Sequence, residues 1–431
     1  SMRSTACSAT PTTAARCHIA RLPRPPLKTG AARLYSRFCS PASITIMPSY
    51  SHPIASKLPK VGTTIFTVMS RLAQEHNAIN LSQGFPDFDC APRLLELVPK
   101  YFNAGLNQYP PMAGVMALRE RVTEKAANLY GAAYDPEHEV TIVPGATYGI
   151  FTAITAFVRP GDEVILFEPT YDSYAPAVEV NGVKPVYVRL QYPDYSIDWN
   201  AVQKAITPKT RMIVINTPNN PTTSVFSAED MRTFENMLRD TGIIVVADEV
   251  YEHLVYDGHQ HQSVARFPGL AERSFVVSSF GKTYSVTGWK MGYVLAPREL
   301  MNEFRKVHQF NVFVTNGPLQ HVLADYMRDP AVYLELAAFY QRKRDFFLDA
   351  VKGSRLRPLP SRGTFFQNFA YDAVTDEKDT ELAIRLTKEK GLAAIPLSVF
   401  YHDGHCDKVL RFCFAKSEAT LAKGAAILRA L

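Results

Sequence analysis

The sequence predicts an α/β protein with a mostly parallel, seven-stranded sheet covered by helices, together with a smaller α+β domain. Two observations lead to this fold class. Between residues 140 and 296, seven short apolar runs alternate with stretches of helical periodicity, and runs that are apolar throughout are typical of strands buried on both faces. After about residue 325 the pattern changes to long charged helices and a few strands, which indicates a second domain.

The predicted elements follow one another in a regular order. The seven apolar runs are residues 140–143, 163–167, 185–190, 212–215, 243–247, 274–277 and 292–296. Helical patterns lie between them, such as residues 227–240, which we expect Ser227 to cap. In the second domain, strands are predicted at 364–369 and 410–415, and a helix is predicted at 417–431.

Length and pattern together predict three segments. A chain of 431 residues is too long for one ordinary core and indicates two or three domains, and its 46% hydrophobic content is typical of a globular protein of this size. We expect residues 91–325 to form the large domain, and residues 47–90 with 326–431 to form the small domain and an N-terminal arm. Residues 1–46 are expected to be a disordered extension.

The net charge of +6 comes from the N-terminal extension. Residues 1–46 hold six Arg, one Lys and no acidic residue, which is +7, so the rest of the chain carries −1. The charge therefore gives no indication of nucleic-acid or membrane binding by the folded body, and no apolar run is long enough to span a membrane. The extension has the composition of an organellar transit segment, or it lies upstream of a natural start at Met47. Prolines at 23, 25 and 26 favour the second interpretation, so we expect a cytoplasmic protein, with the mitochondrial matrix as the alternative.

The cysteines predict neither a metal site nor a disulfide framework. The six are Cys7, Cys17, Cys39, Cys90, Cys406 and Cys413. They include no CxxC pair and no His/Cys spacing typical of zinc sites. Reduced thiols and no bound metal are therefore expected.

Small and aromatic residues follow the first two predicted strands. In open α/β sheets, ligands bind beyond the carboxyl ends of the strands. After residues 140–143, a Pro-Gly turn ends at Gly145, and Ala146 and Thr147 begin a helix whose free N–H groups suit a phosphate. Tyr171 follows residues 163–167 and could stack on a flat ring. Each residue also has an ordinary structural explanation, as part of a tight turn or as a surface tyrosine.

Polar side chains follow the next two strands. Asn220 stands between prolines, where neither a helix nor a central strand continues, so its amide is available as a donor, although Asn-Pro turns are also common for structural reasons. Asp248 directly follows residues 243–247, and Tyr251 comes about one helical turn later. A buried carboxylate at that point needs a cation such as a protonated ring nitrogen, unless Asp248 only caps a helix.

Two lysines complete the set at this edge of the sheet. Ser279 and Lys282 follow residues 274–277, and Lys290 leads into the next strand. They are incidental loop residues or they hold an aldehyde and a phosphate. Together the strand ends supply a phosphate cradle, a stacking ring, an amide donor, a buried acid, a phenol and two lysines. That set matches a phosphorylated pyridine aldehyde.

The motifs that carry these residues resemble those of class I aminotransferases of fold type I, which use pyridoxal 5'-phosphate (PLP). The resemblance runs from about Ser56 to the C-terminus, in NLSQGFPDFD, NQYPPMAGVMALRE, NTPNNP, DEVYEH, SSFGKTYSVTGWKMGY and LRFCFAKSEATL. The branch that it most resembles contains the methionine aminotransferases and the kynurenine aminotransferase/glutamine transaminase K enzymes. The resemblance implies a PLP-dependent transferase fold and a homodimer with active sites shared between subunits.

The resemblance also implies a role for each cofactor-binding residue. Lys282 would bind the cofactor's aldehyde covalently, Asp248 would pair with the ring nitrogen, and Tyr251 would bond the ring hydroxyl. These three are the expected catalytic residues. The other expected cofactor contacts are Gly145, Ala146, Thr147, Tyr171, Asn220, Ser279, Lys290 and, from the partner subunit, Tyr109.

The substrate side of the site follows from the same resemblance. Gly84 and Arg411 would receive the α-carboxylate of an amino acid. Asn220, which with Tyr251 would bond the ring hydroxyl, is a further expected substrate contact. Ile65 and Phe313 would line the pocket for its side chain. Two departures stand out, because Thr223 replaces a glycine of many relatives, and Val314 stands where kynurenine aminotransferases place a histidine from the partner subunit. The first indicates a slightly different turn, and the second weakens a kynurenine-specific assignment.

The expected function is transamination between an L-amino acid with an apolar or aromatic side chain and a 2-oxo acid. Methionine, phenylalanine and tyrosine are the expected donors, with glutamine and kynurenine as further candidates. A PLP-dependent lyase acting on cysteine S-conjugates is the alternative enzyme, because it needs the same residues. A PLP-binding regulator of transcription would need a helix-turn-helix domain, which the Pro-rich residues 1–46 do not supply.

Overall fold

The computed structural model describes residues 49–431. The prediction for residues 1–46, with Cys7, Cys17 and Cys39, lies outside this range. Residues 56–431 group into one unit, which contains all the elements below. Within the described residues, no helix is both long enough and apolar enough to cross a membrane, and no cluster of side chains suits a metal ion.

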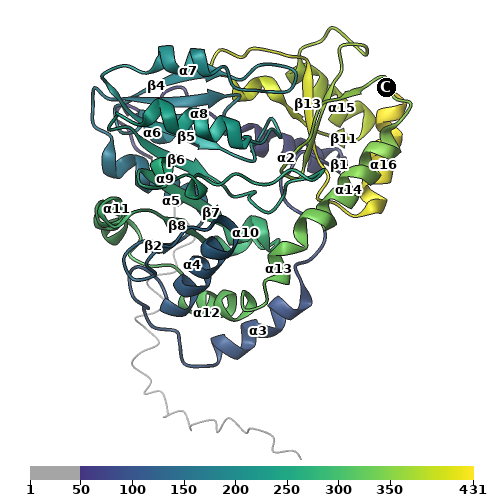
Figure 1. Cartoon of the computed structure of the whole chain (residues 1–431). Coiled ribbons are helices and arrows are strands. Elements are labelled where there is room, and N and C mark those ends of the chain that lie inside the picture. Colours follow the sequence, from purple (N-terminus) through teal and green to yellow (C-terminus); the bar gives the residue numbers. More distant parts are fainter. Residues whose placement is uncertain (1–48) are drawn as a thin grey trace, which may run out of the picture. The chain divides into compact units, whose positions relative to one another are not determined.

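The large sheet has seven strands in the order β2-β8-β7-β6-β5-β3-β4 (Figure 1). Its strands are β2 (Val140–Val143), β3 (Glu163–Glu168), β4 (Lys184–Arg189), β5 (Thr210–Asn216), β6 (Ile244–Asp248), β7 (Ser274–Ser279) and β8 (Gly292–Leu295). Strand β8 runs antiparallel to both of its neighbours, and all other pairs are parallel. The predicted mostly parallel, seven-stranded sheet is therefore confirmed.

Helices surround this sheet and explain the apolar character of its strands. They are α3 (Pro92–Phe102), α4 (Met116–Tyr130), α5 (Ala146–Phe157), α6 (Tyr174–Glu179), α7 (Trp199–Ala205), α8 (Ala228–Leu238), α9 (Pro268–Ala271), α10 (Phe280–Thr283), α11 (Arg298–Asn311) and α12 (Gly317–Tyr326), with short 3-10 helices at Val264–Arg266 and Thr287–Trp289. Every residue of β6 is buried, since neighbouring strands and helices cover it from all sides. Ser227 caps α8 as predicted, in a reciprocal capping box with Asp230.

A second, antiparallel sheet lies in the C-terminal part of the chain, in the order β12-β13-β10-β9. Its strands are β9 (Arg357–Pro358), β10 (Phe366–Ala370), β12 (Ile395–Pro396) and β13 (Val409–Cys413), and β1 (Ile79–Asn80) pairs separately with β11 (Leu392–Ala393). The accompanying helices are α2 (Ile65–Glu75), α13 (Ala331–Leu334), α14 (Leu336–Val351), α15 (Asp379–Lys390) and α16 (Glu418–Arg429), with a 3-10 helix at Leu397–Phe400. The strands and the final helix predicted here are present. The domain boundaries at residues 90 and 325 stay a prediction.

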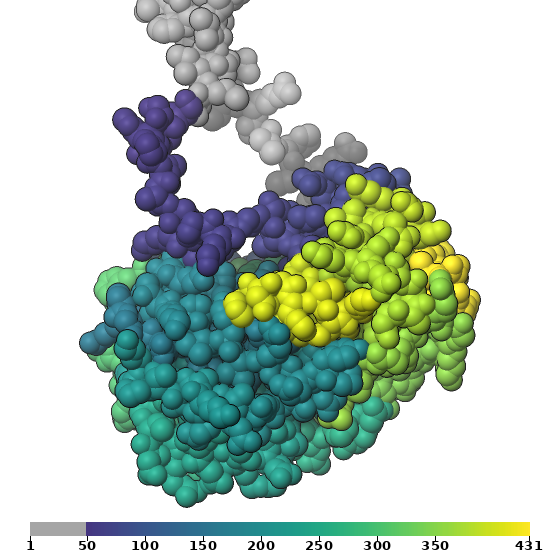
Figure 2. All heavy atoms as spheres, turned by 90° about the horizontal axis from the view of Figure 1, so that it is seen from above, coloured from purple at the N-terminus to yellow at the C-terminus, as the bar shows by residue number. Residues whose placement is uncertain are grey.

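The segment after β3 is bonded to the segment after Phe400. Thr170 N donates to Phe400 O at 2.8 Å, and His402 Nδ1 lies 2.9 Å from the buried Glu168 Oε2. Arg189, at the end of β4, reaches Asp403 at 2.8 Å. Figure 2 shows the yellow C-terminal residues in contact with the teal residues of the sheet region. These bonds hold the segment after β3 next to the segment after Phe400, and both segments contribute residues to the surroundings of the cavity described below.

A buried ion pair anchors the turn that follows β6. Lys125 Nζ on α4 lies 2.6 Å from Glu252 Oε1, and both side chains are at most 5% exposed. Ser278 Oγ at 2.6 Å and Tyr293 Oη at 2.8 Å donate to the same oxygen, and the Tyr130 hydroxyl donates to Oε2. Burial alone would raise the pKa of Glu252, but Lys125 and these donors hold it well below its usual range.

Replacing Lys125 with methionine is expected to lower the free energy of unfolding by about 3–5 kcal/mol, because Glu252 would lose its counter-charge in the core. Unfolding in guanidinium chloride measures the loss. The matched control is Lys306→Met, which breaks the exposed pair with Glu303 and should cost at most about 1 kcal/mol. Equal losses in the two variants would contradict the assignment of a structural role to the Lys125–Glu252 pair.

Candidate active site

A cavity of about 180 Å³ lies beyond the carboxyl ends of the parallel strands. It brings together ten residues predicted from the sequence: Gly145, Ala146, Thr147, Tyr171, Asn220, Asp248, Tyr251, Ser279, Lys282 and Lys290. The remaining wall comes from Asn216, Val250, Gly281, Thr287 and Met291. Loops and short helices that follow five different strands therefore meet at one place, as expected for an open α/β sheet.

One end of the cavity has the features of a phosphate site. Helix α5 begins at Ala146 without a side-chain cap, so the N–H groups of its first turn are available for an anion. Gly145, with φ 87° and ψ 161°, has a positive-φ extended backbone that essentially only glycine adopts. A Cβ atom at this position would lie 3.5 Å from Lys290 Nζ, in the space an anion would need. Ser279, at the end of β7, adds a hydroxyl to the same wall.

A buried acid also lines the cavity. Asp248 ends β6 and is 5% exposed. Burial raises its pKa to about 6, although the Tyr174 hydroxyl, 2.5 Å from Oδ2, and the Val250 N–H, 3.3 Å from Oδ1, lower it. A cation in the cavity would hold this carboxylate ionised. Burial also raises the pKa of Tyr171 to about 12, so its phenol ring is neutral beside the cavity.

Lys282 reaches the cavity from α10, less than one helical turn after β7. Its Nζ donates to Gly84 O at 2.9 Å and lies 5.8 Å from the centre of the Tyr251 ring and 5.5 Å from that of Phe365. Burial lowers the pKa of Lys282 to about 8. A substantial fraction of the amine is therefore neutral slightly above neutral pH, in the form that reacts with a carbonyl carbon or accepts a proton.

Arg411, on β13, is 1% exposed and carries an unused donor. Its Nη1 donates to Asn220 Oδ1 and its Nη2 to Ser82 O at 3.3 Å, whereas Nε has no hydrogen-bond partner among the described residues. Burial lowers its pKa to about 10, so the guanidinium stays cationic at neutral pH. A buried cation with a free N–H is suited to bind a carboxylate.

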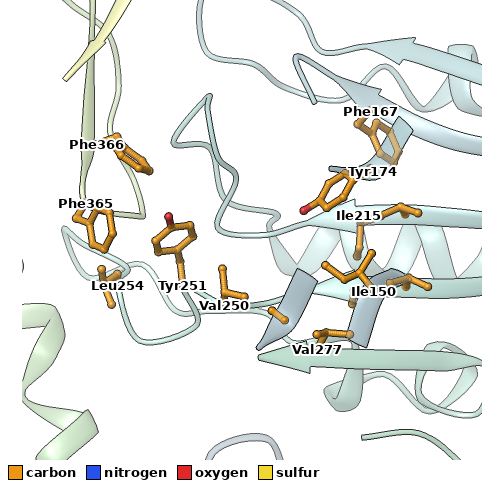
Figure 3. Close-up of a cluster of buried hydrophobic side chains, with 14 of the residues drawn as sticks. Ile150, Phe167, Tyr174, Ile215, Val250, Tyr251, Leu254, Val277, Phe365 and Phe366 are labelled. Atoms are coloured by element: carbon orange, nitrogen blue, oxygen red, sulfur yellow. The ribbon is translucent and has the colours of Figure 1, made fainter. Parts of the chain in front are cut away.

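Aromatic rings surround the guanidinium of Arg411. Its central carbon lies 3.9 Å from the ring centre of Phe366, 5.5 Å from that of Phe66 and 5.6 Å from that of Phe400. Figure 3 shows Phe366 and Phe365 beside the Tyr251 ring. These rings limit the access of water and leave an apolar surface next to the carboxylate-binding group.

Of the other predicted substrate residues, Gly84 lies beside the cavity, whereas Ile65 is not the residue of its helix that contacts Arg411. Gly84 adjoins the cavity through its bond to Lys282, and a Cβ at Gly84 would lie only 2.8 Å from Phe366 Cζ, so a larger residue would displace that ring. Ile65 begins α2, but the neighbouring Phe66 is the residue whose ring faces Arg411.

Tyr109 and Phe313 lie apart from the cavity within the described chain. Their rings are 5.7 Å apart in an edge-to-face pair, and Tyr109 is 84% exposed. Tyr109 and Val314 line a separate surface depression. A single chain therefore does not bring Tyr109 or Phe313 to the cofactor-sized cavity.

Thr223, where many relatives of the resembled family have glycine, adopts φ 68°. This left-handed conformation is uncommon for a β-branched residue. Its N–H donates to Asn219 O at 2.8 Å, and its Oγ1 donates to Pro360 O at 2.9 Å. The turn beside Asn220 therefore keeps a glycine-like backbone, held by hydrogen bonds.

Sequence reasoning missed residues that hold the site in place. Asn216 Oδ1 accepts the Asn220 N–H at 2.7 Å, and its Nδ2 donates to Asp248 O at 2.9 Å. Asn216 ends the apolar run MIVIN, and a polar residue at the end of a predicted strand could have indicated a place in the site. Tyr174 lies three residues after Tyr171 and could have been included for the same reason. Nothing near Phe400 in the sequence indicates that its ring lies beside Arg411.

The donor set fits PLP. An N-terminal helix turn with Gly145 and Lys290 suits its phosphate, and a buried carboxylate suits its ring nitrogen. Lys282, with a lowered pKa, suits its aldehyde. The free Nε of Arg411 then remains for the carboxylate of an amino acid.

Comparisons with known proteins agree with this geometry. Residues 76–428 match the family described as aminotransferase class I and II. The methionine aminotransferase of Escherichia coli is 48% identical over 377 residues, which cover 87% of this chain and 98% of that protein. A crystal structure of an Escherichia coli protein identified as having a methionine aminotransferase function has a TM-score of 0.87 at 47% identity, and the match covers 88% of this chain and 100% of that one.

A more distant relative comes from Homo sapiens. Its kynurenine–oxoglutarate transaminase 1 is 34% identical over 386 residues, which cover 81% of this chain and 92% of that protein. The family match spans most of the chain, and its members use PLP to exchange the amino group of an amino acid with the oxo group of a 2-oxo acid. The chain therefore belongs to the class I and II aminotransferases and is a PLP-dependent transaminase.

Proposed function

We propose that this transaminase prefers amino acids with apolar or aromatic side chains, with methionine as the main candidate donor. The observation that carries the proposal is the Arg411 guanidinium, which can bind one carboxylate among three phenylalanine rings. The methionine aminotransferase relative, 48% identical, supports methionine in particular. The comparisons do not favour the cysteine S-conjugate lyase as the alternative.

Lys282 is the proposed proton carrier. PLP, when bound, supplies an electron sink that stabilises the negative charge left on the substrate Cα after its proton is removed. Lys282 Nζ accepts that proton, and its lowered pKa of about 8 keeps part of the amine available as a base. The same Nζ would later donate the proton to the carbon of the cofactor, which would complete the transfer of the amino group.

Asp248, Tyr251 and Asn220 are proposed to orient the cofactor. The buried Asp248 carboxylate would pair with the ring nitrogen and favour its protonated form, with little reorganisation during the reaction. The Tyr251 hydroxyl and the Asn220 amide are hydrogen-bond donors for the ring hydroxyl, and both residues line the cavity. Tyr171 provides the stacking surface.

Arg411 is proposed to fix the substrate. Two N–H groups of a guanidinium can bind both oxygens of an α-carboxylate, which orients the Cα–H bond toward Lys282. Gly84 is proposed to lie at the same end of the site, because its carbonyl already contacts Lys282 Nζ. Phe66 and, at the edge of the pocket, Ile65 are proposed to contact the side chain of the donor.

A homodimer completes the proposed site. Tyr109 is 84% exposed in the single chain and Phe310 is 86% exposed, although both are large apolar side chains. A second copy that covers this surface would bury them, with Tyr109 and Phe313 reaching the partner's cavity.

The division into a large domain (91–325) and a small domain (47–90 with 326–431) belongs to the same proposal. The cytoplasmic location stays a prediction, and no finding supports the mitochondrial alternative.

The expected donor preference tests the proposed substrate class. We expect kcat/KM for methionine to exceed that for aspartate by at least about a hundredfold, which corresponds to ~2.7 kcal/mol. A methionine side chain gains roughly 1.5–3 kcal/mol from burial, whereas a second carboxylate would be desolvated without a counter-charge. Residues 310–318, where dicarboxylate-specific members of the resembled family carry a second arginine, contain no basic residue.

Steady-state assays with one common oxo acid measure this preference. Phenylalanine serves as the second apolar donor and should also exceed aspartate. Equal kcat/KM values for aspartate and methionine would rule out the apolar pocket, while the transaminase activity itself would stand.

A further inference from the structure

Tyr174 is a buried residue in contact with Asp248, the acid that lines the cavity. It begins α6 and is 3% exposed. Its hydroxyl donates to Asp248 Oδ2 at 2.5 Å, a short bond between a phenol and a carboxylate. In Figure 3 the Tyr174 hydroxyl points toward the side of the view that holds Val250 and Tyr251. The contact joins α6 to the end of β6, two elements that are far apart in the sequence.

We propose that Tyr174 is a positioning residue for transamination, whose hydroxyl holds the Asp248 carboxylate ionised and oriented toward the ring nitrogen of PLP. The inference rests on the proposed function, because it takes Asp248 as the partner of that nitrogen. It adds a residue that does not itself line the cavity.

The hydrogen bonds of Asp248 leave one oxygen for the cofactor. Oδ2 is occupied by Tyr174, whereas among residues 49–431 Oδ1 receives only the Val250 N–H at 3.3 Å. Tyr174 therefore restrains the rotation of the carboxylate and leaves Oδ1 able to accept a stronger bond. The Tyr174 ring also meets the Tyr171 ring edge to face, with centroids 5.6 Å apart, so one residue contacts both the acid and the proposed stacking ring.

Tyr174 remains a donor at any working pH. Burial and the charge of Asp248 raise the pKa of its phenol well above the usual value, so the proton stays on Tyr174. A hydrogen bond donated to a carboxylate favours its ionised form. Without this hydroxyl, the pKa of Asp248, already raised to about 6 by burial, would rise further.

Other titratable groups also act on Asp248. They come from the segment after β3, from the turn after β6 and from α10: Tyr171, Glu249, Tyr251 and Lys282. Lys282 favours the charged carboxylate, and Glu249 disfavours it. None of these groups changes when Tyr174 becomes phenylalanine, so a difference between the variant and the wild type reports the hydroxyl.

The test is the affinity of the apo protein for PLP between pH 6 and pH 9, measured through the absorbance or fluorescence change on binding. In Tyr174→Phe, we expect the pH below which affinity falls to rise by about one unit, since one hydrogen bond to a charge shifts a pKa by about that much. The variant's Kd should be about twofold above the wild-type Kd near pH 7 and about fivefold above it at pH 6, because a pKa about one unit higher leaves more of the Asp248 carboxyl group protonated. The two values should converge near pH 9, where the carboxyl group is ionised in both proteins.

Two further variants separate the possible outcomes. Tyr195→Phe removes another buried hydroxyl bonded to a carboxylate, that of Asp407 at 3.4 Å, and should bind PLP like the wild type at every pH. Asp248→Asn should weaken PLP binding across the whole range. If Asp248→Asn binds PLP normally, the proposed role of Asp248 fails. If it binds weakly while Tyr174→Phe matches the wild type, or differs from it by the same factor at every pH, only the role of Tyr174 is overturned.

Discussion

Replacing Lys282 with alanine is expected to lower kcat/KM for transamination by at least about 10⁴-fold. The variant loses the only amine that lines the cavity from α10, and with it the proposed base for the Cα proton. A positioned base contributes up to about 10⁴ to a rate, and covalent attachment of the cofactor is lost as well. Assays with methionine and one oxo acid measure the change, and PLP absorbance shows whether the cofactor still binds.

Lys290→Ala is the matched control, because Lys290 Nζ lies in the same cavity at the phosphate end. It should weaken PLP binding but leave measurable turnover at saturating PLP. Treating the wild-type holoenzyme with borohydride and mapping its peptides should find the cofactor on Lys282. A label on Lys290, or an active Lys282→Ala variant, would show that the two lysines have been assigned the wrong roles.

Replacing Arg411 with methionine is expected to lower kcat/KM for methionine by about 10³-fold. The substrate carboxylate would then be buried among Phe66, Phe366 and Phe400 without a counter-charge, which costs about 4 kcal/mol. Most of the loss should be an increase in KM, because Arg411 is proposed to bind the substrate rather than the cofactor. The affinity for PLP, measured in the same preparation, should change little.

Arg411→Lys serves as the control for charge. It keeps a cation at this position but not the fork of N–H groups, so an intermediate loss is expected. Both variants lose the bond from the Arg411 guanidinium to Asn220, so a difference between them reports the charge at position 411 and not the loss of that bond. A change of less than tenfold in KM for Arg411→Met would mean that the carboxylate binds elsewhere.

The large sheet and the cofactor end of the cavity could be predicted from the sequence for a physical reason. Strands buried on both faces are apolar throughout, so β5 and β6 stand out from the helices around them. Parallel strands end at one edge of a sheet, so the residues that follow them meet without any further information. Tyr171, Asp248 and Lys282 were found in this way, and all three line the cavity.

The substrate end depended on the resemblance to a family rather than on the pattern of the chain. Arg411 bonds to Asn220, which is 191 positions away, and nothing in the sequence near either residue indicates the other. Tyr109 is a further example, because its proposed role needs a second chain. The surface that it shares with Phe313 shows only that a large aromatic pair is exposed.

The fold class, and the lysine, acid and tyrosines at the ends of the strands, could therefore be predicted from the chain alone. Which side chains touch is visible in the folded structure alone: Tyr174 with Asp248, Lys125 with Glu252, and the phenylalanine rings with Arg411. Periodicity is a local property of the backbone, and it places each residue on its own element. A contact between two elements depends on how they pack, and the pKa of a buried group depends on that packing, because desolvation and partner charges act over a few ångströms of space rather than along the chain.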